Sequence, residues 1–250
     1  MCTITAIVNQ KGGVAKTTTA LALTSRLREM GKRVLAVDLD PQGNFTYATG
    51  VEGYSHTVVD VMRREVKADK AVFQDLLASS PHLAASDVTF TQVGKEFLLK
   101  EALLPLREKY DFIVLDCPPS LGLLSVAALT AADECVLPCQ ADMYSLTGLM
   151  QMGETLEAVR TYTNPSLVVS GVLLCRYNAR SVISREMLAM IQRTAHDLNT
   201  RLFHARIREC SALKEAAALR RPSIFEYAPH SNAAQDYAAF TDEFLANIWR

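Results

Sequence analysis

The sequence of 250 residues lacks the features that mark membrane, secreted and modular proteins. It contains no uninterrupted apolar run of about 18 residues, and its start, MCTITAIVNQ, lacks the basic residues and apolar stretch of a secretion signal. No repeat, no low-complexity tract and no linker rich in proline, glycine or serine divides the chain. With 49% hydrophobic and 21% charged residues, the composition predicts a cytoplasmic globular protein with one domain, residues 1–250.

Paired cysteines of the C-x-x-C kind are also absent, although the chain has six cysteines. Most of them lie in or beside apolar runs, which is typical of reduced, buried thiols in a cytoplasmic protein. Cys135 and Cys139 stand four residues apart in CVLPC, and a metal-binding pair is one interpretation of them. We favour a strand with two small buried side chains, because free cysteine behaves as a small hydrophobic residue.

Five apolar, β-branched runs alternate with helical patterns along the chain. They are TITAIV (3–8), RVLAVDL (33–39), DFIVLD (111–116), ECVLP (134–138) and LVVSGVLLC (167–175). Continuous apolar strands separated by helices are typical of a parallel sheet that is covered on both faces. We therefore expect an α/β fold with a doubly wound, mainly parallel sheet. The first helix is expected at about 17–30, ended by Gly31.

The segment NQKGGVAKTT (9–18) leaves the first predicted strand and opens the first predicted helix. The free N–H groups at the start of a helix attract phosphate. Gly12 and Gly13 lack a Cβ, so the backbone can curl around an anion, and Lys16 adds a charge that reaches the phosphates. Thr17 supplies a hydroxyl oxygen of the kind that Mg²⁺ prefers. A plain glycine turn is the alternative, but it leaves the lysines and Thr17 unexplained.

The loop departs from the common pattern G-x-x-x-x-G-K-[ST], because Gln10 and Ala15 stand where that pattern has glycine. KGGVAKTT instead resembles the deviant Walker A motif, K-G-G-x-x-K-[ST], of the ParA/MinD family of P-loop ATPases. In that family the extra lysine, here Lys11, reaches across a nucleotide-sandwich homodimer to the partner's ATP. Most ParA-like relatives have glycine in place of Ala15; a positive φ there would cost on the order of 1 kcal/mol and slow nucleotide use.

Two further segments resemble the acidic motifs of the same family. GKRVLAVDLDPQGN (31–44) is similar to its second acidic motif, which implies that Asp40 orients the attacking water and that Asp38 lies near the water shell of Mg²⁺. DFIVLDCPPSLG (111–122) is similar to the Walker B strand, which implies that Asp116 holds a magnesium-bound water. A single acid at the end of an apolar strand is as often a cap or turn residue. The three acids together with the loop favour a Mg²⁺-dependent ATPase.

The resemblance extends over essentially the whole chain, and ALTAADECVLPCQADMYSLTGL (128–149) matches the ParA subgroup better than the other branches. CRYNARSVISREML (175–188) is similar to a segment in which an asparagine faces adenine, although a turn asparagine is the alternative there. The implied nucleotide-binding residues are Lys11, Gly12, Gly13, Val14, Ala15, Lys16, Thr17, Thr18 and Asn178. The implied catalytic residues are Lys11, Lys16 and Asp40, and the implied metal residues are Thr17, Asp38 and Asp116.

Charge is distributed unevenly although the net formal charge is only −1. Residues 176–221 carry ten basic and four acidic residues, a net +6, whereas the rest of the chain carries 16 basic and 23 acidic residues, a net −7. A basic surface of this kind suits a phosphate backbone without reading bases, and solvated helix faces are the alternative. Together with the ParA resemblance, the segment predicts nonspecific DNA binding. The candidate residues are Arg180, Arg201, Arg206, Arg220 and Arg221.

The resemblance implies a ParA-like partition ATPase that binds double-stranded DNA on the nucleoid as an ATP-bound homodimer and is stimulated by a ParB-like protein. A MinD-like ATPase at a membrane needs a basic carboxy-terminal helix, whereas DYAAFTDEFLANIWR is mainly acidic on its polar side. The third function is that of a metabolic reductase or ligase, for which Cys117 and Cys135 form no convincing cluster ligands. Because the first strand begins close to Met1, we expect no helix-turn-helix extension.

Overall fold

Seven parallel strands form a single sheet in the computed structural model, which describes residues 2–248. The strand order is β3-β2-β4-β1-β5-β6-β7. The strands are β1 (Thr3–Ile7), β2 (Val34–Asp38), β3 (Leu76–Leu77), β4 (Phe112–Asp116), β5 (Glu134–Cys139), β6 (Val168–Tyr177) and β7 (Leu202–Arg208). The chain runs outward from β1 in both directions, so a crevice forms at the carboxyl ends of the central strands, where doubly wound sheets bind their ligands.

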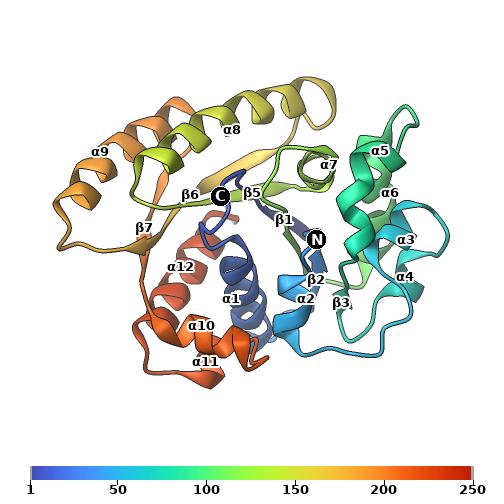
Figure 1. Ribbon diagram of the computed structural model, residues 1–250, viewed down its shortest axis with the longest axis horizontal. Coiled ribbons are helices and arrows are strands. Elements are labelled where there is room, and N and C mark those ends of the chain that lie inside the picture. Colours follow the sequence, from blue (N-terminus) through green and yellow to red (C-terminus); the bar gives the residue numbers. More distant parts are fainter. Residues whose placement is uncertain (1, 249–250) are drawn as a thin grey trace.

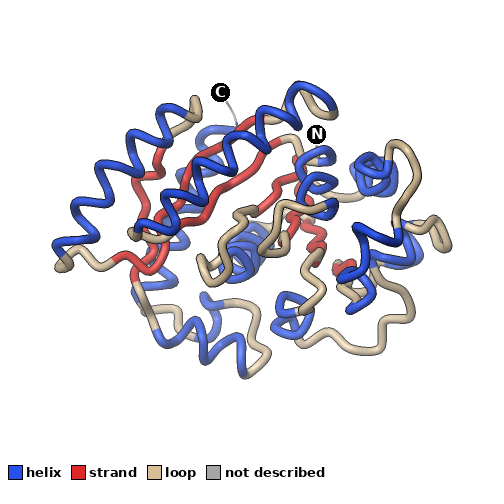
Figure 2. The backbone as a smooth tube through the Cα atoms, turned by 45° about the horizontal axis from the view of Figure 1, so that its top comes forward, coloured by secondary structure: helices blue, strands red, loops and turns tan. Residues whose placement is uncertain are grey.

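Helices cover both faces of the sheet, as Figures 1 and 2 show. The helices are α1 (Lys16–Glu29), α2 (Asn44–Thr49), α3 (Val58–Met62), α4 (Ala68–Ala71), α5 (Ser86–Thr89), α6 (Leu98–Leu103), α7 (Leu123–Ala131), α8 (Met143–Tyr162), α9 (Val182–Asp197), α10 (Ser211–Ala218), α11 (Ile224–Tyr227) and α12 (Asn232–Ile248). Side chains of a strand alternate between two cores: Val34 and Ala36 of β2 pack with α1 and α12, whereas Leu35 and Val37 pack with α6 and α7. Burial on both faces explains why these runs are apolar throughout.

The structure confirms the α/β fold and the five predicted strands, with shifts of one to two residues at their ends. It also confirms the first helix, which starts at Lys16 and is followed by Gly31 in the left-handed conformation, φ 77°. Cys135 and Cys139 lie fully buried on β5, as a strand with small side chains requires. The sequence patterns missed two strands, because β3 has two residues and β7, LFHARIR, buries only Phe203 and Ile207.

The outer strand β7 is covered along its free edge by acidic side chains of α12. Glu243 accepts hydrogen bonds from the backbone N–H groups of His204 and Ala205, both at 3.0 Å. Asp236 accepts a bond from the backbone N–H of Arg208 and pairs with its guanidinium at 2.6 Å. Strand edges that are satisfied in this way do not invite edge-to-edge pairing. Among residues 2–248, no helix has the length and apolar character needed to cross a bilayer.

Candidate nucleotide-binding site

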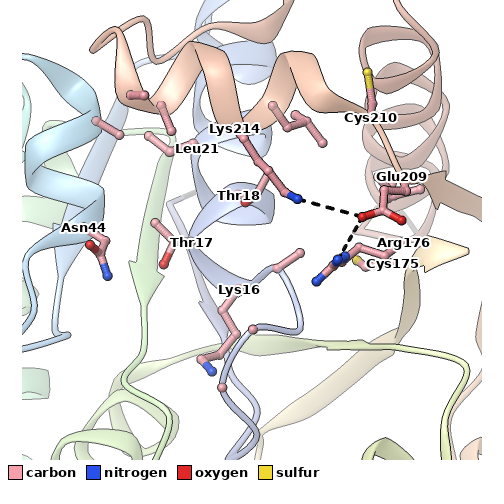
Figure 3. A pocket seen from close by; sticks show the side chains of 18 of the residues that line it. Lys16, Thr17, Thr18, Leu21, Asn44, Cys175, Arg176, Glu209, Cys210 and Lys214 are labelled. Carbon is pink, nitrogen blue, oxygen red and sulfur yellow. Dashed lines mark hydrogen bonds and ion pairs between the residues drawn. The ribbon is translucent and has the colours of Figure 1, made fainter.

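A cavity of about 570 Å³ opens at the carboxyl ends of the central strands. One end is lined by the loop before α1, by the first turn of α1 and by Asp40 after β2, and the other by the ends of β6 and β7, by α10 and by Tyr237 of α12. Figure 3 shows Lys16 and Thr17 at the first end and Arg176, Glu209 and Lys214 at the second. The volume lies within the range of small-molecule sites, and the position is where this kind of sheet binds ligands.

The loop that precedes α1 has an open backbone. Gly13 and Ala15 both adopt left-handed conformations, with φ of 76° and 73°, and the first helical hydrogen bond runs from the Thr19 N–H to the Ala15 carbonyl. Among the described residues, the backbone N–H groups of residues 13–17 donate no well-formed hydrogen bond. Ala15 thus has the positive φ considered in the sequence analysis. Its methyl group strains this conformation by about 1 kcal/mol relative to glycine.

Lys16 is the buried cation of this loop. Only 6% of the residue is exposed, and its Nζ donates a hydrogen bond to the backbone carbonyl of Lys11 at 2.9 Å. Burial lowers the pKa of Lys16, while the charges of Asp116 and Asp40 act in the opposite direction. A buried cation whose one close acceptor is a neutral carbonyl is placed to meet an incoming anion.

Asp116 ends β4 as a fully buried carboxylate. Within residues 2–248 neither of its oxygens has a well-formed hydrogen bond, although the Thr17 hydroxyl lies close enough to lower its pKa. Burial and the neighbouring Asp38 carboxylate outweigh that effect and hold the pKa well above its ordinary value. Native proteins rarely leave a buried carboxylate without partners, so the group is suited to a cation or its water shell. Asp116 and Thr17 together offer the hard oxygen atoms that fit Mg²⁺.

Asp38 and Asp40 have different surroundings although they lie two residues apart, at the end of β2 and just after it. Asp38 is completely buried, and it accepts hydrogen bonds from the Asp40 N–H at 3.1 Å and from the Thr46 N–H and hydroxyl, both at 2.8 Å. Burial raises the pKa of Asp38 to about 6 despite these bonds. Asp40 lines the cavity and accepts a bond from the Gln42 N–H at 3.0 Å. Asp38 thus fixes the loop that carries Asp40, and it is not among the residues that line the cavity.

Lys11, the extra lysine of the loop, points toward α8. Its Nζ lies 2.7 Å from Oδ2 of Asp142 and 3.1 Å from the hydroxyl of Ser145. Gln140, just before α8, donates a hydrogen bond to the Gly13 carbonyl at 2.6 Å. The start of α8 therefore holds the phosphate-binding loop from one side. In the single chain, the charge of Lys11 is neutralised by Asp142 rather than directed at the cavity.

Asn178 lies outside the cavity lining. It is exposed, and its Oδ1 accepts a hydrogen bond from the Arg180 N–H at 3.0 Å, as in a turn of the Asx type. Arg176, Glu209, Lys214 and Tyr237 line the cavity instead, and the sequence motifs did not single them out as site residues. The available signal was a charged residue at the end of an apolar strand for Arg176, and charged residues after the last strand for Glu209 and Lys214. Tyr237 lies within an amphipathic helix and gave none.

The five predicted DNA-binding arginines come from different elements. Arg201 donates to the Ser170 carbonyl and stacks on Phe203, and Arg206 stacks on Tyr177. The remaining three follow β6 and α10. Arg220 pairs with Glu52 and stacks on Tyr47, whereas Arg180 and Arg221 are exposed and belong to no ion pair within residues 2–248.

Comparisons with known proteins agree with this geometry. A family model described as an AAA domain matches residues 2–169. The sporulation initiation inhibitor protein Soj of Bacillus subtilis is 36% identical over 98% of both chains, and the chromosome-partitioning ATPase Soj of Thermus thermophilus is 37% identical over 97% of this chain and 95% of its own. A crystal structure of cobyrinic acid a,c-diamide synthase from Mycobacterium smegmatis with bound ADP and magnesium is 32% identical, covers 97% of this chain and 93% of its own, and has a TM-score of 0.82. The chain belongs to the ParA/Soj/MinD family of P-loop ATPases.

Proposed function

We propose that the protein is a ParA-like DNA-partition ATPase that binds ATP with Mg²⁺, dimerises around the nucleotide and holds DNA without sequence preference. A ParB-like protein stimulates its hydrolysis, and the ATP-bound form resides on the nucleoid. The observation that supports this most directly is the buried Asp116 carboxylate, which has no well-formed hydrogen bond and lies beside Lys16 and Thr17 at the open phosphate-binding loop. The names of the two Soj relatives and their identity over nearly the whole chain support the same function.

In this proposal the chain's own groups divide the work of hydrolysis. The N–H groups of the loop and Lys16 bind the phosphates, and Asp40, which lines the cavity, orients the attacking water. Asp116 and Thr17 would hold Mg²⁺, which when bound would supply positive charge against the phosphates. Asp38 acts through the loop, since its two oxygens are bonded to Asp40 and Thr46. Substitution of Asp40 by alanine is expected to trap an ATP-bound dimer, which light scattering detects as a doubled mass; a persistent monomer contradicts the assignment.

Dimerisation in this proposal requires Lys11 to leave Asp142. The ion pair is partly exposed, with side-chain exposures of 27% and 34%, so separating the charges is feasible when ATP supplies a stronger anion. Lys11→Ala is expected to retain ATP binding by one chain and to lose the ATP-dependent dimer. Lys100→Ala, an exposed lysine on α6, is the matched control. Dimers of normal stability in Lys11→Ala would remove this lysine from the interface.

DNA binding is assigned to the basic segment 176–221, and Arg180 and Arg221 are the two of the five candidate arginines that are exposed and have neither an ion pair nor an aromatic ring contact within residues 2–248. Each alanine variant is expected to weaken binding to unrelated DNA sequences equally and to reduce the slope of log affinity against log salt by about one per lost phosphate contact. Arg63→Ala is the control, because Arg63 is also exposed and lies on α3's carboxyl end, outside the basic segment. An unchanged slope in both variants would place the DNA elsewhere.

The experiment that tests the whole proposal measures DNA retention with ATP, with ADP and without nucleotide, beside sedimentation with anionic vesicles. Retention that requires ATP, without vesicle binding, is the expected result. A MinD-like membrane role has little support here, because Tyr237, Phe240 and Phe244 of α12 are buried in the core and do not form a lipid-facing side.

An ATP-dependent ligase is the second candidate. It is favoured by one observation, the likeness to the Mycobacterium smegmatis structure of cobyrinic acid a,c-diamide synthase, at 32% identity and a TM-score of 0.82. The retention experiment separates the two functions, because a ligase has no reason to hold DNA when ATP is bound. ATP binding without any ATP-dependent DNA retention would favour the ligase.

A further inference from the structure

The end of the cavity opposite the phosphate-binding loop contains a carboxylate, Glu209, whose two oxygens have different partners. Glu209 follows β7, and its Oε1 receives a hydrogen bond from Nη2 of Arg176 at 2.8 Å and lies 3.9 Å from Nζ of Lys214. The dashed lines in Figure 3 mark these two contacts. Both cations act on the same oxygen, and no donor among the described residues bonds to Oε2. One acceptor at the cavity wall thus stays open while the charge of the group is compensated.

The backbone beneath this cluster is irregular in a way that directs Arg176. The pairing of β6 with β7 shifts register between Cys175 and Tyr177, and Arg176 at the shift adopts a left-handed conformation with φ of 53°. Such irregularities turn a side chain away from the strand's alternation, and they cost free energy in a residue other than glycine. The carboxylate's partner therefore comes from a strained position that packing must maintain. Lys214 approaches from the first turn of α10.

Apolar side chains line the same cavity as this cluster and the phosphate-binding loop. Leu21 of α1 and Leu213 and Ala217 of α10 line the same cavity. A purine base needs an apolar surface for its faces and a few polar groups at its edge, which is the usual composition of such sites. The cavity thus combines a phosphate cradle, an apolar wall and a charged edge, which are the three kinds of surface that the triphosphate, ribose and base of a nucleotide require.

We propose that Glu209 reads the base of the bound nucleotide by accepting a hydrogen bond from the 6-amino group of adenine at its open Oε2. This inference rests on the proposed binding of ATP in this cavity. Arg176 and Lys214 are positioning residues that keep Oε1 occupied and neutralise the carboxylate, which otherwise would repel an anionic ligand. The site therefore discriminates between purine nucleotides by one polar contact, and not by the shape of the pocket alone.

The test compares two ligands that differ only in the 6-amino group, ADP and purine riboside 5′-diphosphate, by calorimetric titration with Mg²⁺. Diphosphates are not hydrolysed to a different ligand during the titration, and both carry the same charge, so changes in general electrostatics cancel in the ratio of their affinities. The wild-type protein is expected to prefer ADP about tenfold, the usual worth of a hydrogen bond to a charged group. Glu209→Ala is expected to bring the ratio close to one.

Glu215→Ala is the matched control, because Glu215 is an exposed acid one residue from Lys214, bonds to Tyr227 and does not line the cavity. It should keep the wild-type ratio. An unchanged ratio in Glu209→Ala, with ADP still bound, would overturn the inference and leave the proposed function standing. Failure of the wild-type protein to bind ADP or ATP would overturn the proposed function, and this inference with it.

Discussion

The two ends of the cavity use charge in opposite ways. At the phosphate end Lys16 and Asp116 are buried, and neither has an ion-pair contact within residues 2–248. At the base end Arg176, Glu209 and Lys214 are exposed and neutralise one another. Buried groups without partners raise the free energy of the empty protein, whereas exposed pairs change it little. The first end is thus organised for a ligand at a cost to stability, and the second is organised by its own residues.

The difference teaches that unsatisfied buried charge collects at the end where we propose that the phosphates and metal of the ligand bind. Backbone strain occurs at both ends, at Ala15 and at Arg176. The left-handed Ala15 lies between the open N–H groups of the loop and α1. Functional sites commonly store strain in this way, because the ligand relieves it on binding. Substitutions at the phosphate end should therefore separate ligand binding from stability, and those in exposed pairs outside this cavity, such as Glu52 with Arg220, should affect neither strongly.

Lys16→Ala tests the phosphate end of the cavity and should have the largest effect on ligand binding. Removal of the buried cation is expected to reduce ATP affinity at least a hundredfold, about 3 kcal/mol, because a charge-assisted bond to phosphate is lost in a buried setting. Titration with a fluorescent ATP analogue measures this loss of affinity. Lys100→Ala on α6 should bind normally. Unchanged affinity in Lys16→Ala would refute the loop assignment.

Asp116→Asn should change binding and stability in opposite directions. Without the carboxylate, Mg²⁺ should no longer strengthen ATP binding. The nucleotide-free variant should unfold at a higher urea concentration than the wild type, and its free energy of unfolding should be higher by about 1–3 kcal/mol, because a buried charge without partners is removed. Urea unfolding and ATP titration with and without Mg²⁺ provide both measurements. A variant that is less stable than the wild type would contradict our description of Asp116.

The stability difference between Asp116→Asn and the wild type should depend on pH. A carboxyl group whose pKa is raised on folding stabilises the protein below its unfolded pKa, near 4, and that contribution disappears as the pH rises through the folded pKa. Burial raises the pKa of Asp116 well above its ordinary value. The advantage of Asp116→Asn should therefore be small near pH 4, grow by roughly 1.4 kcal/mol per pH unit between the unfolded and the folded pKa, and stay constant above the folded pKa. An advantage that does not depend on pH would mean that charge is not its cause.

Ala15→Gly removes backbone strain at the phosphate end and leaves its charges in place, so it separates the two contributions to stability. Glycine tolerates φ of 73°, so the variant should gain about 1 kcal/mol in urea unfolding. Ala20→Gly, in the middle of α1 with ordinary helical geometry, should lose about the same amount. If Ala15→Gly destabilises the protein, the loop conformation in solution differs from the one described.

Glu52→Gln tests an exposed pair outside the phosphate end and should have the smallest effect. Glu52 pairs with Arg220, and the side chains are 71% and 42% exposed. Water and salt screen such pairs, so the melting temperature should change by less than about 2 °C and the ATP affinity should stay the same. A large loss of stability would show that this pair, with Tyr47, supports the cavity wall.

Most of the residues that the sequence assigned to the phosphate end lie at one cavity in the structure, because the loop is built from neighbours in the chain. Apolar runs predicted the buried strands, and the loop followed from glycines and lysines at fixed spacing. Of two acids two residues apart, spacing alone did not tell which one faces the cavity; the hydrogen bonds of Asp38 to Thr46 decide it. The base end depends on a register shift between β6 and β7, and no local pattern predicts where a shift will turn Arg176.

The acids of α12 restrict how other proteins attach to this one. Asp236 and Glu243 occupy backbone donors that an incoming extended peptide would need along β7. Recruitment of a regulator by strand addition is therefore disfavoured on that border. On this side of the molecule, the stimulating protein that we propose would have to recognise side chains on helices and loops, and its specificity could evolve without disturbing the sheet.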